Sequence, residues 1–114
     1  MLINLGGMRK VQVDPTLMVA RAQGGARNED LDLAGFAVHL HTTAGTNPDT
    51  GLGGLVLGGG IGYLVRQLGM SIDNLEEVEL VDAQGRVLRA SEKSEPELFW
   101  AMRVRSNLRG AAQS

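Results

Sequence analysis

Apolar and polar residues alternate in two parts of the chain, and each part is predicted to form a β-hairpin. Residues 10–14 alternate with a period of two, as a half-buried strand does. Asp14-Pro15 then supplies a turn before a second strand near residues 18–22. The first hairpin therefore spans about residues 10–22.

The second hairpin joins residues 75–81 to residues 86–90 across a turn at residues 82–85. Because side chains of a strand point alternately to its two faces, one face of this hairpin should be apolar. The residues that we expect on this inner face are Val78, Leu80 and Val87.

Helical periodicity predicts two helices between the hairpins. The first spans residues 29–38, with Asn28 as its N-cap and with Glu29 and Asp30 in its first turn. Its buried stripe is predicted to consist of Leu31, Ala34 and Val38. The second is a short helix over residues 61–68, which Gly69 should terminate.

A last helix is predicted to follow the capping box Ser94-Glu95-Pro96-Glu97. Its large side chains, Phe99 and Trp100, are expected in the core. Hairpins with helices between them make the predicted fold class α+β, with mainly antiparallel sheet and flanking helices.

Eight of the sixteen glycines lie between Gly45 and Gly62, in GTNPDTGLGGLVLGGGIG. The apolar residues within this run argue against a flexible linker, because they require burial. Glycine permits close approach of the backbone, and exposed rows of backbone N–H groups bind phosphate groups. Two interpretations remain open: a phosphate or cofactor loop, and a tight packing corner without a ligand.

Two common nucleotide-binding motifs do not match this run. A Walker loop ends in Gly-Lys-Ser/Thr, and no lysine lies between Lys10 and Lys93. The Rossmann motif G-x-G-x-x-G fails because Tyr63 stands where its last glycine should be. We therefore expect neither a mononucleotide P-loop nor a nicotinamide-binding fold.

The composition is that of an ordinary soluble domain of 114 residues. A net charge of −2 gives no electrostatic reason to expect nucleic acid or a membrane as a partner. The chain has no cysteine, which excludes disulfides and thiolate chemistry, and its first ten residues do not resemble a signal peptide. From this we expect a cytoplasmic location.

Few side chains offer catalytic or metal-binding chemistry. His39 and His41 are the only histidines, and without a third predicted ligand we expect them to be ordinary loop or strand residues. Tyr63 could line a cofactor pocket or belong to the core. Asp73-Asn74 could form an Asx turn or brace the glycine run from behind.

Several ordered motifs connect the glycine run with its surroundings. The run contains Thr-Gly-x-x-Gly-Leu-x-Leu-Gly-Gly-Gly-x-Gly at residues 50–62, followed by Asp73-Asn74-Leu75, the turn at residues 82–85, and ELFWAMR at residues 97–103. Over about residues 2–103 the chain resembles the FAD-binding domain of the vanillyl-alcohol oxidase and p-cresol methylhydroxylase (PCMH) type. Within that type it is most similar to the berberine-bridge-enzyme-like FAD-linked oxidases.

The resemblance implies FAD as the cofactor and assigns no catalytic or metal-binding residue. The implied FAD-binding residues are Ala44, Gly45, Thr50, Gly51, Leu52, Gly54, Leu55, Gly58, Gly60, Gly62 and Tyr63. Backbone N–H groups are expected to make most of the contacts, chiefly those of Thr50, Gly51, Leu52, Gly54 and Gly58.

Asn47 occupies the position at which bicovalent members of the family carry a flavin-linking cysteine, in Ala-Gly-x-Cys-Pro. Since the chain has no cysteine, a cysteinyl bond is excluded, and FAD is expected to bind noncovalently through this segment. The implied reaction is oxidation of an alcohol, sugar or C–H donor through flavin N5.

In the family the flavin lies between two halves of its domain, and this chain resembles the second half. The first half is expected to precede residue 1 and the substrate domain to follow residue 103, so residues 1–103 form a partial PCMH-type domain. Residues 104–114 leave the family pattern and are expected to be a disordered or frameshifted tail.

The chain alone is expected to lack activity, and to self-associate or to require a chain that supplies the missing half. The alternative is a non-catalytic binding or assembly module, or a structural remnant of a truncated oxidase.

Overall fold

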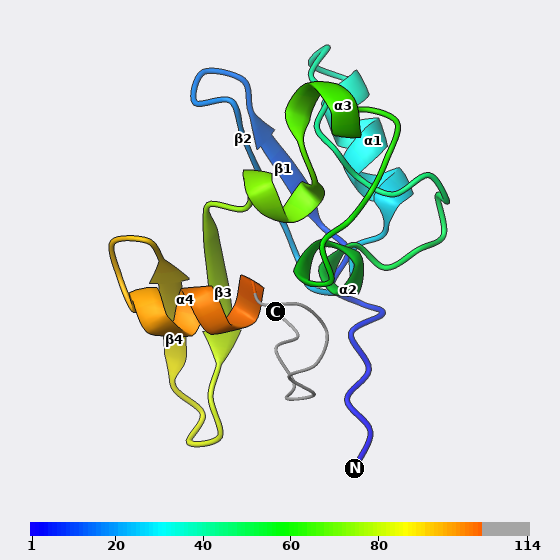
Figure 1. Ribbon diagram of the computed structural model, residues 1–114. Coiled ribbons are helices and arrows are strands. Elements are labelled where there is room, and N and C mark those ends of the chain that lie inside the picture. The colour runs from blue at the N-terminus through cyan, green and yellow to red at the C-terminus, as the bar shows by residue number, and fades with distance from the viewer. Residues whose placement is uncertain (104–114) are drawn as a thin grey trace.

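The computed structural model describes residues 1–103, so the predicted tail at residues 104–114 lies outside the described residues. Figure 1 shows two β-hairpins, each accompanied by helices, which confirms the α+β fold class. The elements are β1 (Val11–Asp14), β2 (Val19–Ala22), α1 (Asn28–Phe36), α2 (Leu52–Leu57), α3 (Val65–Leu68), the 3-10 helix η1 (Ser71–Asn74), β3 (Glu77–Val81), β4 (Val87–Ser91) and α4 (Pro96–Arg103).

Both predicted hairpins are present as two-stranded antiparallel sheets. β1 pairs with β2, with Val11 opposite Ala22, and α1 packs against β1. β3 pairs with β4, with Val78 opposite Ala90, and α4 lies across this hairpin (Figure 1).

The predicted inner face of the second hairpin is wrong at Val87. Val78 and Ala90 are buried opposite each other, and the next inward pair is Leu80 with Leu88. Val87 pairs with Val81 one residue out of phase and is 64% exposed. Leu88 therefore takes the inward position that was expected for Val87.

The last helix differs from its prediction at both its start and its buried face. Helix α4 begins at Pro96, whereas Ser94 belongs to the preceding turn, where its N–H donates to Ser91 Oγ over 3.1 Å. Phe99 and Met102, three residues apart, are buried, but Trp100 is 68% exposed. Trp100 lies about 100° further round the helix and so misses the face toward β4.

Helix α1 starts one residue earlier than predicted, because Arg27 is its N-cap and Asn28 is its first residue. Ala26, Ala44 and Leu52 form a buried cluster at its start, with Leu31 and Val56 packed against them. The predicted stripe of Leu31, Ala34 and Val38 is half-buried instead of buried, and Val38 lies beyond the end of the helix at Phe36.

The glycine run holds an element that sequence reasoning missed. Helix α2 occupies Leu52–Leu57 within the run, and α3 covers only Val65–Leu68 instead of residues 61–68. Gly69 terminates α3 with a φ of 81°, as predicted.

Candidate functional site

The glycine run passes along the start of α1 and is fixed there by the backbone. An isolated antiparallel bridge joins Arg27 to Gly51. On either side of it, Leu52 N–H donates to Ala26 O over 2.8 Å and Asn28 N–H donates to Thr50 O over 3.0 Å. The beginning of α2 is thereby held against the beginning of α1.

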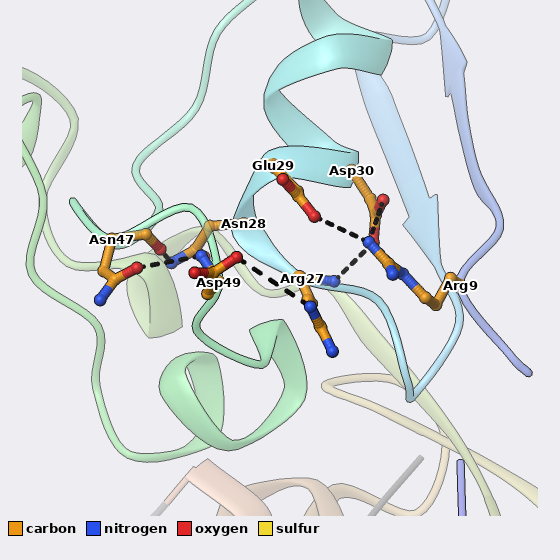
Figure 2. A network of polar contacts seen from close by, with 7 residues as sticks. All are labelled: Arg9, Arg27, Asn28, Glu29, Asp30, Asn47 and Asp49. Carbon is orange, nitrogen blue, oxygen red and sulfur yellow. Dashed lines mark hydrogen bonds and ion pairs between the residues drawn. The ribbon is translucent and has the colours of Figure 1, made fainter. Parts of the chain in front are cut away.

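The side chain of Asn28 makes a second connection to the same run. Asn28 is fully buried; its Nδ2 donates to Asn47 O over 2.8 Å, and its Oδ1 accepts from Gly45 N–H over 3.3 Å. Figure 2 shows this side chain directed from α1 to Asn47. Asn28 therefore bonds to the glycine run, and the prediction of Asn28 as N-cap is wrong.

A charged cluster supports the start of α1 from its other side (Figure 2). Arg9 Nε and Nη2 each donate to Asp30 over 3.0 Å, and Nη2 also donates to Glu29 over 2.9 Å. Asp30 accepts in addition from the Arg27 N–H over 2.8 Å. The Arg9 guanidinium and this backbone N–H hold the pKa of Asp30 below its ordinary value.

The end of the glycine run rests on η1. The N–H groups of Ser71 and Ile72 each donate over 2.9 Å, to Gly60 O and Gly59 O respectively. The buried Ser71 hydroxyl donates to Thr43 O over 2.8 Å, which ties the two ends of the run together.

Asp73 and Asn74 do not brace the glycine run with their side chains. Asp73 Oδ2 accepts from Met70 N–H over 2.9 Å, and Asn74 Nδ2 donates to Leu68 O and Met70 O over 3.0 Å each. Both side chains stabilise their own turn, but neither forms an Asx turn, because Asp73 accepts from a residue three positions before it and Asn74 donates. Both interpretations are therefore wrong, and the bracing comes from Ser71 and Ile72.

Four glycines of the run are required by the packing of this chain itself. A Cβ at Gly62 would collide with Ala44 O, and a Cβ at Gly45 would collide with Asn28 Nδ2. Gly59 and Gly60 have φ values of 115° and 75°, which favour glycine, and a Cβ at Gly60 would also strike the Ser71 side chain. The packing-corner interpretation accounts for these four positions.

Gly51 and Gly54 have no such explanation within the chain. A Cβ at either position would meet no atom within 4 Å, and both residues are exposed. Neither has a positive φ. Close packing within residues 1–103 therefore does not require glycine at Gly51 or Gly54, and Gly51 is the N-cap of α2, a position that favours glycine.

The structure narrows the set of backbone donors that this run can offer. The N–H groups of Thr50, Leu52 and Gly58 already donate within the chain, to Asn47 O, Ala26 O and Gly54 O. The hydrogen bonds of residues 1–103 include no acceptor for the N–H groups of Gly51 and Gly54. Of the five expected donors, these two are the ones left available.

The remaining candidate side chains lie at the surface. Tyr63 is 87% exposed, so its assignment to the core is wrong. His39 and His41 are exposed loop residues, as expected. Within the described part of the chain, no group of three or more potential ligand side chains is placed to hold a metal ion. None of the helices described here has the length and apolar character of a membrane span.

Comparison with known proteins finds a matching family and several similar proteins. Residues 1–91 match the profile of the FAD binding domain family. FAD-linked oxidoreductase pgmH from Aspergillus terreus is 45% identical over 103 residues, which cover 90% of this chain and 21% of that protein. Berberine bridge enzyme-like 9 from Arabidopsis thaliana is 39% identical over 111 residues, covering 90% of this chain and 20% of that protein.

The same fold occurs in the solved structure of glucooligosaccharide oxidase from Acremonium strictum. The TM-score is 0.77 at 36% identity, over 85% of this chain and 20% of the oxidase. The family match and the shared fold define an FAD-binding domain. The chain belongs to the FAD binding domain family, with relatives of the berberine-bridge-enzyme-like type, and it spans about a fifth of the length of the curated relatives it matches.

Proposed function

We propose that the chain forms one wall of the FAD site of an FAD-linked oxidoreductase. The proposal rests chiefly on Gly51 and Gly54, where a Cβ would meet no atom of the chain within 4 Å. Both lie in the part of the chain that matches the FAD binding domain family. Side chains at these two positions would be tolerated by the chain but would obstruct a ligand at the surface. The proposed contact residues remain those predicted, at positions 44–63.

The exposed part of the glycine run suits a phosphate-bearing cofactor. The free N–H groups of Gly51 and Gly54 offer uncharged donors to anionic oxygens. Tyr63 is available at the surface to contact a planar ring. Bound FAD would supply the hydride-accepting flavin ring for oxidation of an alcohol, sugar or C–H donor, and the chain would supply binding and orientation.

We further propose that FAD is not attached covalently through this segment. The solved glucooligosaccharide oxidase is described as carrying 6-S-cysteinyl, 8α-N1-histidyl FAD, and this chain has no cysteine. Asn47, in the position of the cysteine, uses its Oδ1 to accept from Asp49 N–H over 3.0 Å. A tryptic peptide covering residues 28–66 should therefore keep its unmodified mass, and a flavin adduct on it would contradict the proposal.

The opposite wall of the site is proposed to come from the first half of an FAD-binding domain. We call this chain, joined to the upstream half of the FAD-binding domain of the Aspergillus terreus relative, the completed domain. FAD added to the completed domain should bind, with quenching of its fluorescence. Absence of binding by the unsubstituted completed domain would contradict the proposed function.

The substitution Gly54→Val tests the glycine assignment, because the chain has room for the new side chain. FAD affinity should fall by tenfold or more, equal to about 1.4 kcal/mol of binding free energy. Gly7→Val is the matched control, because Gly7 also has open space around it and lies outside the run. Equal FAD affinity of both variants and the unsubstituted domain would rule out close contact at Gly54.

A further inference from the structure

The segment at residues 43–46, where the proposed FAD site begins along the chain, makes no backbone–backbone hydrogen bond within residues 1–103. Within residues 1–103, its hydrogen bonds come only from two side chains of other elements. Asn28 Oδ1 accepts from Gly45 N–H over 3.3 Å, and Ser71 Oγ donates to Thr43 O over 2.8 Å. Side chains thus fix a stretch of backbone that neither a helix nor a strand fixes.

Both side chains are buried and use their polar atoms on this stretch. Asn28 is fully buried and Ser71 is 4% exposed. Asn28 Nδ2 extends the contact by donating to Asn47 O over 2.8 Å (Figure 2). Buried polar groups with satisfied hydrogen bonds select one backbone arrangement, since any other would leave them unpaired.

The held backbone atoms belong to alternate residues, namely Thr43, Gly45 and Asn47. The N–H groups of the residues between them, Ala44 and Thr46, have no acceptor among the described hydrogen bonds. This arrangement also explains why two positions of the family motif are occupied by glycine. A Cβ at Gly45 would collide with Asn28, and a Cβ at Gly60 would collide with Ser71.

We infer that Asn28 and Ser71 are positioning residues of the FAD site, which hold residues 43–47 so that the exposed Thr46 presents its N–H group to the cofactor. The inference rests on the proposed function and adds residues that the glycine motif does not contain. Neither residue touches FAD; both act through the backbone that they hold.

The test compares Asn28→Leu and Ser71→Ala in the completed domain. Each removes the polar contact with little change in volume, and Ser71→Ala provides the readout if Asn28→Leu does not fold. Each should weaken FAD binding by about tenfold. The visible absorption bands of the flavin should also shift at saturating FAD, because the cofactor meets a displaced backbone.

Phe99→Leu is the matched control, since it disturbs a buried side chain of α4 on the β3–β4 hairpin. It should lower the urea midpoint yet leave the FAD dissociation constant and the flavin bands unchanged. Unchanged affinity and bands in both Asn28→Leu and Ser71→Ala would overturn the inference while the proposed function stands. It would also be overturned if Phe99→Leu lost as much FAD affinity as these two variants at an equal loss of stability. Failure of the unsubstituted domain to bind FAD would instead contradict the proposed function.

Discussion

Arg9 connects the N-terminal segment to the first turn of α1, and its partner Asp30 makes this connection sensitive to acid. The lowered pKa of Asp30 arises first from the Arg9 hydrogen bonds and then from the Arg27 N–H. A carboxyl with a lowered folded-state pKa contributes stability above its unfolded pKa of about 3.9. This contribution is lost as the pH falls through the folded pKa.

Arg9→Met should therefore reduce the acid sensitivity of the fold. Between pH 5 and pH 3, the free energy of unfolding measured in urea should fall less in Arg9→Met than in the unsubstituted chain. Arg21→Met is the control, because Arg21 forms no ion pair among residues 1–103. The same pH dependence in Arg9→Met and the unsubstituted chain would show that the Arg9–Asp30 contact does not affect stability.

At the level of single residues, sequence reasoning located the glycines but not the residues that hold them. Asn28 stands before Glu29 and Asp30 in a pattern typical of an N-cap. The partner that decides its role, Gly45, lies 17 residues away and is brought near only by the fold. Ser71 gives no local signal either, because its contact with Thr43 spans 28 residues.

Among the elements, α1 ends in a way that suggests a stabilising substitution. Leu40 N–H donates to Gly35 O over 2.9 Å and His39 N–H donates to Phe36 O over 3.2 Å, the two hydrogen bonds of a Schellman motif. His39 has a φ of 58°, a conformation that glycine adopts without strain.

His39→Gly should raise the free energy of unfolding by about 1 kcal/mol, since it removes the strain of a side chain in the left-handed region. Urea unfolding measures the change. His41→Gly is the matched control, because His41 is exposed and lacks a positive φ, so this variant should show no gain. A destabilised His39→Gly variant would contradict the assignment of His39 to this motif.

The elements that sequence reasoning found are those with a regular apolar pattern. Both hairpins alternate and both were predicted, but the phase of β4 was not, because Val87 and Leu88 are both apolar and only the register decides between them. Helix α2 was missed because its residues include Gly53 and Gly54, which have low helix propensity. The helix is stabilised by the packing of Leu52 and Val56 with Ala26 and Ala44, and not by the helix propensity of its own residues.

At the scale of the whole molecule, large apolar side chains remain at the surface of residues 1–103. They include Leu2, Ile3, Ile61, Tyr63 and Trp100. Exposed apolar surface of this kind promotes association. A single wall of a site also binds a ligand less tightly than two, because half of the contacts are absent.

Alone, the 114-residue chain should therefore self-associate, bind FAD weakly or not at all, and show no oxidase turnover. Size-exclusion chromatography with an absorbance scan of the purified chain measures the first two properties together. A monomer that carries the visible bands of FAD would show that this chain holds the cofactor without another wall.

The most direct test of the central claim is amide hydrogen exchange of the completed domain with and without FAD. FAD should slow exchange within residues 44–62, above all at the N–H groups of Gly51 and Gly54, which have no acceptor among the described residues. The turn at residues 82–85, between β3 and β4, should exchange at the same rate in both states. FAD binding without added protection anywhere in residues 44–62 would contradict the claim that the glycine run is a wall of the site.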